Sequence, residues 1–283
     1  MTKNFKTSEL DMLYGTTSVK MPIPGGKLPD IREILDISFK NQKEIDLVII
    51  SLDIDRLILS AEERNDETKP DFLYDDNWLN DAGYLWNKSI LVHDCLGNLK
   101  RTLQKEPSMT FDEYSSFSFE TGEKTVLEKY YRRDDIVEEK PFTAEDKELV
   151  SQNVMTNYAT LIEQNPQTEF LFFVPPYSVV FWDDLFRNGD VERILSAEEE
   201  AIRILLQYDN VKVFCFNEKQ EWICNLDNYS DSMHYTGDIN SAILQDMHEE
   251  AYRIKKDDLT EHIEESRLFF KNYDYDIICG SQP

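Results

Sequence analysis

Basic residues are scarce in this sequence, and their scarcity excludes several classes of partner. The 283 residues contain 30 Lys and Arg against 56 Asp and Glu, which gives a formal net charge of −26. Binding to phosphate groups requires clustered cations, so this balance argues against nucleic acids and anionic membranes. We therefore predict that the protein binds neither, and the charge alone identifies no specific ligand.

Long apolar runs and local ligand motifs are also lacking. No stretch approaches the roughly 20 apolar residues of a membrane span, so the chain alone is expected to be soluble. The four cysteines form no C-x-x-C pair, and the four histidines show no metal-ligand spacing with one another or with cysteine. No Gly-rich phosphate loop follows an apolar run, which disfavours a nucleotide binder. These absences predict buried free thiols, no metal site and no cofactor.

Three apolar runs predict the fold. Residues 45–52, 169–174 and 211–216 are nearly continuous apolar stretches, as expected of strands that helices cover on both faces. Stretches with helical spacing separate them, which indicates βαβ units and a parallel sheet. We predict one α/β domain over residues 1–283, with a parallel sheet that has helices on both faces. An insertion of helices and loops is expected at about 61–142, as either a lid or a surface excursion.

Shorter elements complete the predicted chain. Residues 18–21 are expected to form a further short strand, and residues 222–224 continue from the third apolar run. Apolar spacing and capping residues predict helices at 7–13, 29–40, 78–88, 90–103, 143–164, 191–207, 237–255 and 259–272, with a helical turn at 182–186.

Polar loops follow the predicted strands. Residues 22–26, 53–56 and 175–178 come directly after them, and parallel strands bring such loops to the edge where open α/β sheets bind ligands. Charges that merely solvate a loop would explain 53–56 equally well. Asp231 and His234 lie in a loop after the last strand and can join the others. Their Asp-x-x-His spacing lets a carboxylate orient an imidazole as general base, although an Asp-rich chain also produces this spacing by chance.

Four segments resemble one known family. They are residues 18–26, the apolar run into Leu52-Asp53, residues 175–178 and residues 226–235. Together they resemble the SGNH (GDSL-type) hydrolase superfamily, particularly bacterial envelope members related to the teichoic-acid D-alanylation protein. The resemblance extends over nearly the whole chain. It implies a three-layer, flavodoxin-like parallel sheet. It also implies an extracytoplasmic protein, membrane-anchored in its intact form.

The same resemblance implies a site and a chemistry. His234 and Asp231 would belong to a Ser-His-Asp triad, and the Gly25 or Gly26 N–H would donate to the oxyanion. The resemblance places Asp53, Asp55 and Tyr177 in the same oxyanion and substrate-binding region. The substrate would be an ester-bearing carbohydrate or envelope polymer with acyl or aminoacyl groups, or a small ester. Hydrolase and acyltransferase activity are both implied.

Two departures from the family pattern bear on activity. The counterparts of the family's Gly-x-Asn block are Asp53 and Asp55, and an ionised aspartate only accepts hydrogen bonds. Either Asp55 is protonated, or another donor serves, or the correspondence is shifted. The family's serine ends a first strand, whereas Met1-Thr2-Lys3-Asn4-Phe5-Lys6 resembles the residues just after it. We therefore expect that strand, its serine and any membrane anchor to be missing from this chain, which would leave it without esterase activity.

Residues 275–281 offer an alternative nucleophile. They resemble a strand ending in Gly-Ser, which would place Ser281 at the nucleophile position, within the chain or in a homo-oligomer. An ordinary C-terminal tail is the competing interpretation. Ser18, Ser51 and Ser178 fit better as hydroxyls at turns and strand ends. A chain without a nucleophile leaves a second function open, a non-catalytic binding or scaffold protein that grips a carbohydrate or a partner through its insertion.

Overall fold

A four-stranded sheet forms the centre of the protein. The computed structural model describes residues 2–42, 44–65, 77, 79–88, 90–107, 110, 112–113 and 120–280. The strand order in the sheet is β1-β2-β3-β4, with β1, β2 and β3 parallel and β4 antiparallel to β3. The strands are β1 (Leu47–Ser51), β2 (Glu169–Val174), β3 (Val211–Cys215) and β4 (Arg253–Ile254). This open, mostly parallel sheet confirms the predicted α/β fold class.

The apolar character of the three parallel strands explains their position. Ile50 lies opposite Phe172, which in turn lies opposite Val213, and all three side chains are buried. Strands covered on both faces bury successive residues instead of alternating ones, and the central strand β2 does so from Phe170 onward. β1 alternates between buried and half-buried residues, consistent with its place at one edge of the described sheet.

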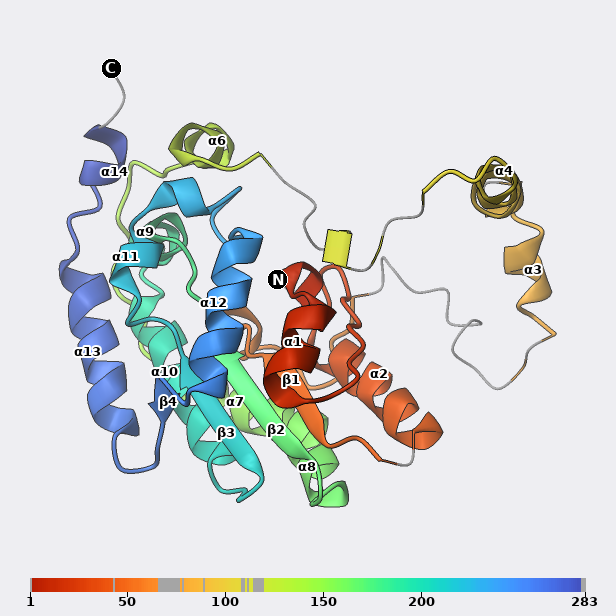
Figure 1. The fold of residues 1–283 in the computed structure, drawn as a ribbon. Coiled ribbons are helices and arrows are strands. Elements are labelled where there is room, and N and C mark those ends of the chain that lie inside the picture. The colour runs from red at the N-terminus through yellow and green to blue at the C-terminus, as the bar shows by residue number, and fades with distance from the viewer. Residues whose placement is uncertain are drawn as a thin grey trace.

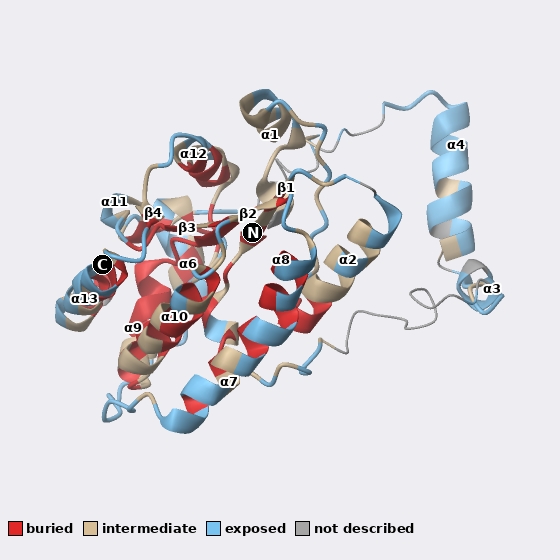
Figure 2. Ribbon diagram, turned by 90° about the horizontal axis from the view of Figure 1, so that it is seen from below, coloured by how far each residue is buried: buried red, intermediate tan, exposed pale blue. Residues whose placement is uncertain are grey.

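Helices cover both faces of the sheet. α1 and α12 lie on one face, whereas α7, α8, α9 and α10 lie on the other, flanked by α2 and α13 (Figures 1 and 2). The result is the three-layer arrangement expected from the sequence. The bounds of these helices are α1 (Thr7–Tyr14), α2 (Leu28–Asn41), α7 (Ala144–Val154), α8 (Thr160–Gln164), α9 (Val179–Arg187), α10 (Val191–Leu205), α12 (Gly237–His248) and α13 (Leu259–Asn272).

The predicted insertion carries several short helices. They are α3 (Ala82–Leu85), a π-helical turn (Ile90–Leu96), α4 (Gly97–Leu103) and α6 (Glu123–Lys129). α3 and α4 stand apart from the sheet (Figure 1), whereas α6 buries Val126 in the core. The acidic and aromatic run at 71–76 and Trp78 lie outside the described residues.

Several predicted segments fold differently. The helix predicted at 237–255 ends at His248, and Arg253–Ile254 within that range form β4. Residues 18–21 form no strand, because the Ser18 N–H donates to the Asp11 carboxylate (2.7 Å) and Val19 stays exposed. Residues 222–224 belong mainly to a short helix, α11 (Gln220–Ile223). The C-terminal segment forms helix α14 (Ile277–Gly280) in place of the expected strand. A homo-oligomer built on that strand therefore loses its structural basis.

Two further sequence expectations can be compared with the fold. Within the described ranges, no helix combines the length and the apolar character needed to cross a membrane. The cysteine prediction is correct in part, since Cys215 is buried, Cys224 is half-buried and Cys95 is exposed.

Candidate active site at the carboxyl edge of the sheet

The loop that carries Asp231 and His234 is closed by its own hydrogen bonds. Tyr229 and Tyr235 form an antiparallel bridge across its base. Inside this bridge, the Ser230 N–H donates to the His234 carbonyl oxygen at 2.9 Å. The loop is therefore a small hairpin in which the two candidate residues have fixed backbone positions.

Asp231 orients the imidazole of His234. Its Oδ1 accepts the backbone N–H groups of Met233 and His234 at 2.9 and 2.8 Å. The ring atom Nδ1 lies 2.8 Å from Oδ2 and 2.9 Å from Oδ1. A carboxylate at Nδ1 favours the tautomer with its proton on that atom, so Nε2 becomes the basic nitrogen. The His234 side chain is 52% exposed, which makes it accessible to a substrate from solution.

The surroundings of Asp231 lower the pKa of its carboxyl group. Partial burial acts to raise its pKa, but the hydrogen bonds from the His234 ring and from two backbone N–H groups outweigh burial and lower the pKa to about 2. The carboxylate is therefore ionised throughout the physiological pH range. An ionised partner at this position stabilises the imidazolium that forms when the ring accepts a proton.

Hydrogen bonds join this hairpin to the loop after β2. The buried Tyr229 hydroxyl donates to the Pro176 carbonyl oxygen at 2.7 Å. Ser178 donates its N–H and its hydroxyl to the Ser232 carbonyl oxygen at 3.1 and 2.8 Å. The loop that follows β2 thus fixes both sides of the hairpin.

Asp53 connects the loops after β1 and β2. Its Oδ1 accepts the Ser51 hydroxyl at 2.6 Å and the hydroxyl of the buried Tyr177 at 3.0 Å. Both contacts use Asp53 as an acceptor. Asp53 therefore serves as a structural anchor of this edge, with Oδ1 engaged as an acceptor of two hydroxyl groups.

Asp55 has a different electrostatic environment. Burial of its carboxyl group and the negative charge of Asp53 raise the pKa of Asp55 to about 6, against the opposing effect of Arg56. The Arg56 Nε lies 3.7 Å from Asp55 Oδ2, and the Asp55 side chain is 32% exposed. A carboxyl group with this pKa is protonated in about a tenth of molecules at pH 7 and in most molecules at pH 5. Once protonated, Asp55 has an O–H donor.

The two candidate glycines have separate structural roles. Gly25 adopts φ +63°, a conformation that residues with a Cβ rarely adopt, whereas a Cβ there would meet only the movable end of the Asn65 side chain (Nδ2, 2.6 Å). The Gly26 N–H donates to the Ile23 carbonyl oxygen at 3.1 Å, and the Arg56 guanidinium donates to the Gly26 carbonyl. The Gly26 N–H is thus used within the turn, which favours Gly25 as the backbone donor.

The serines considered as nucleophiles have other hydrogen-bond partners. Ser51 donates to Asp53, Ser178 donates to the Ser232 carbonyl, and Ser18 donates to the Thr7 carbonyl at 3.3 Å. Ser281 lies outside the described residues. The structure therefore gives the first three serines the turn and strand-end roles that the sequence predicts.

Two supports of the hairpin have no signal in the sequence. Lys129, at the end of α6, donates through Nζ to the Ser230 carbonyl oxygen at 2.7 Å. Asn4 donates through Nδ2 to the Tyr235 carbonyl oxygen at 3.3 Å. Both contacts join residues more than a hundred positions apart, so no local spacing reveals them.

One group of potential metal ligands lies among the described residues. Glu198, Cys215 and His262 are all buried, and their potential ligand atoms lie within 4.8 Å of one another. The group sits where α10, the end of β3 and α13 meet. The expectation of no metal site depended on spacing along the chain, whereas these three residues come from separate elements.

Comparisons with protein-family models, with curated proteins and with solved structures found no match for this chain. The family resemblance noted in the sequence therefore stays a hypothesis, and a functional proposal must rest on the geometry of the sheet edge.

Proposed function

We propose that His234 is the general base and acid of an SGNH-type acyl-transfer site, and that Asp231 orients its imidazole. The observation that carries this proposal is the contact of 2.8 Å between the Asp231 carboxylate and His234 Nδ1, on a hairpin fixed at the carboxyl edge of the sheet. Ligands bind at this edge in open α/β folds. The substrate class is an acyl or aminoacyl ester of an envelope glycan or similar polymer, with hydrolysis and transfer as the two outcomes of one intermediate.

The proposed reaction assigns a step to each group. A serine hydroxyl attacks the ester carbonyl while His234 Nε2 accepts the serine proton, and the ring then returns that proton to the leaving alcohol. The acyl-serine that remains passes its acyl group to water or to an acceptor hydroxyl. Asp231 holds the imidazole tautomer throughout. The Gly25 N–H and a protonated Asp55 are the donors proposed for the oxyanion.

The nucleophile determines how this proposal is tested. The family resemblance implies a nucleophilic serine at the end of a strand, in a Gly-x-Ser turn, so the assay uses the protein with such a strand added at its N-terminus. We expect this protein to hydrolyse a 4-nitrophenyl ester and His234→Ala to lower kcat/KM by about 10²- to 10⁴-fold. His248→Ala is the matched control, because His248 is exposed on the last turn of α12. Full activity in a folded His234→Ala variant would refute the proposal.

The chain of residues 1–283 gives a second readout. We expect it to show no turnover of the same ester. Turnover that Ser281→Ala abolishes would assign the nucleophile to Ser281 instead.

A non-catalytic binding protein is the second candidate. Two expected oxyanion donors are engaged elsewhere: Asp53 accepts hydrogen bonds, and the Gly26 N–H donates within its own turn. Groups engaged in this way cannot stabilise an oxyanion, which favours a binding protein. Calorimetric titration with an O-acetylated glycan distinguishes the two functions. Binding without turnover, unchanged in His234→Ala, would favour the binding protein.

A further inference from the structure

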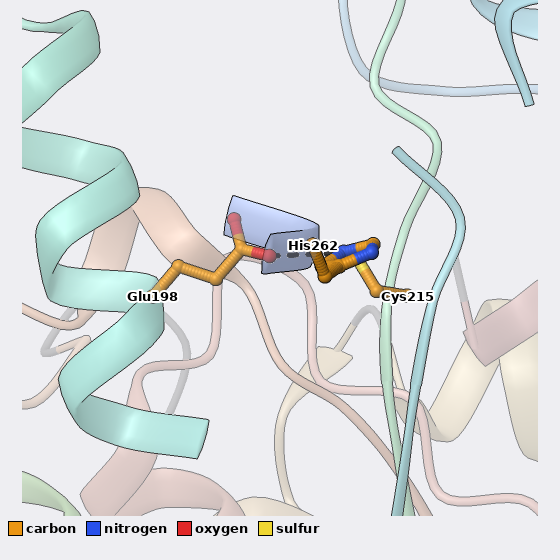
Figure 3. Close-up of side chains that lie close together, drawn as sticks. All are labelled: Glu198, Cys215 and His262. Carbon is orange, nitrogen blue, oxygen red and sulfur yellow. Dashed lines mark hydrogen bonds between the residues drawn. The ribbon is translucent and has the colours of Figure 1, made fainter. Parts of the chain in front are cut away.

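Three buried ionisable side chains converge from different elements of the fold. Glu198 comes from α10, Cys215 ends β3 and His262 comes from the first turns of α13. Figure 3 shows the three side chains pointing toward one another. Their exposed fractions are 0%, 0% and 4%, so the cluster is enclosed by the protein.

The hydrogen bonds of this cluster leave two polar atoms unpaired. Glu198 accepts the Cys215 thiol at 3.3 Å and the Asn217 amide at 3.2 and 3.3 Å. Within the part of the chain that the structure describes, the buried atoms His262 Nε2 and Asn217 Oδ1 have no hydrogen-bond partner. A buried polar atom without a partner destabilises the fold, so each requires an explanation. A bound cation would supply a partner for His262 Nε2, and for Asn217 Oδ1 once the amide, whose nitrogen contacts Glu198, turns that oxygen toward the ion.

The arrangement around His262 is typical of a metal ligand. Its Nδ1 lies 2.6 Å from Glu218 Oε1. Histidines that bind metals usually donate their second ring N–H to a carboxylate, which fixes the tautomer and directs the other nitrogen to the ion. Here Glu218 holds Nδ1, and the unpaired Nε2 is the nitrogen left to coordinate.

The donor set and its spacing fit a tetrahedral ion. Thiolate, imidazole and carboxylate are the three ligand types of zinc, and bond lengths of about 2.0 to 2.3 Å place tetrahedral ligands roughly 3.3 to 3.7 Å apart. The distance of 3.3 Å between Cys215 Sγ and Glu198 Oε1 agrees with this value. The potential ligand atoms of the three residues all lie within 4.8 Å of one another, so no pair would have to close by more than about 1.5 Å to reach tetrahedral spacing.

We propose that Glu198, Cys215 and His262 bind one divalent cation of the zinc class, a structural site that ties α10, β3 and α13 together. Asn217 offers its amide oxygen as the fourth ligand. Cys215 coordinates as a thiolate, and its proton is released when the ion binds. Because the site is enclosed, the ion stabilises the fold and takes no part in chemistry at the sheet edge. The proposal is independent of the function proposed above.

Cobalt titration tests the site directly. Residues 1–283 are treated with a chelator and then titrated with Co²⁺, both as the folded chain and during refolding from denaturant. We expect one ion per chain, a thiolate-to-cobalt charge-transfer band in the near ultraviolet and the visible bands of tetrahedral Co²⁺. Zn²⁺ should displace the cobalt and raise the thermal midpoint.

Matched variants locate the ligands. Cys215→Ser should abolish the charge-transfer band and His262→Gln should weaken cobalt binding at least tenfold, whereas Cys224→Ser and His248→Gln should change neither. If the wild-type chain is folded and shows no charge-transfer band, the proposal is wrong, even if its acidic surface binds cobalt in octahedral form. Loss of the band in Cys224→Ser with retention in Cys215→Ser would contradict it equally.

Discussion

Among single residues, Asp55 offers a direct electrostatic test of the sheet edge. Its pKa is raised to about 6 by burial and by the charge of Asp53, so the folded state holds the proton more tightly than the unfolded chain. A raised carboxyl pKa stabilises the fold fully below about pH 4, and this stabilisation is lost as the pH rises through about 6. We compare the free energy of unfolding of Asp55→Asn with that of wild type at two pH values. We expect the difference, variant minus wild type, to be larger at about pH 8 than at about pH 5.

Urea unfolding at both pH values measures this difference. The exposed Asp257 supplies the matched control, Asp257→Asn, for which we expect no comparable change with pH. An Asp55→Asn variant with the same stability relative to wild type at both pH values would show that Asp55 titrates normally.

Single residues also show what a sequence can reveal about a site. Asp231 and His234 were identifiable because both contacts that define the pair are local, between residues three positions apart. The ligands of the proposed metal site come from three separate elements, so their spacing along the chain does not identify them. The sequence placed both glycines in a loop. Only the backbone hydrogen bonds of the structure show that the Gly26 N–H is used within the turn, which favours Gly25 as the donor.

At the level of elements, two buried tyrosines of the hairpin, Tyr229 and Tyr235, allow a controlled comparison. The Tyr229 hydroxyl donates to Pro176 at 2.7 Å, whereas the buried Tyr235 hydroxyl has no partner among the described residues. Tyr229→Phe leaves a buried carbonyl unpaired, which should lower the free energy of unfolding by about 1 to 3 kcal/mol. Tyr235→Phe should change it by less than about 0.5 kcal/mol or stabilise the protein slightly. Equal losses in the two variants, measured by urea unfolding, would contradict this assignment.

Two of the strands that were predicted correctly share one property. The runs at 169–174 and 211–216 are nearly continuous apolar stretches, so burial between two helical layers determines their conformation. Residues 18–21 lack such cover, and local polar contacts hold them instead. In the C-terminal segment, Tyr275 and Ile278 are both buried at a spacing of three, which suits a helix, and the sequence alone did not separate this pattern from a strand.

At the scale of the whole molecule, charge repulsion is the dominant long-range effect. With 56 acidic and 30 basic residues, ion pairs can neutralise only part of the acidic surface. Raising NaCl from about 10 mM to about 150 mM shortens the Debye length from about 30 Å to about 8 Å and weakens this repulsion. We expect the thermal midpoint to rise, with the same increase in KCl. A midpoint that falls or stays constant would show that screened ion pairs outweigh the repulsion.

The proposed acyl-transfer site is tested most directly by a fluorophosphonate probe, which modifies a serine only when a general base activates it. The protein with an upstream strand ending in Gly-x-Ser is labelled, and mass spectrometry identifies the modified residue. We predict one labelled serine, with labelling lost in His234→Ala and slowed by up to about 10⁴-fold in Asp231→Asn. Equal labelling in a folded His234→Ala variant, or no labelled serine in the folded protein, would contradict the proposal.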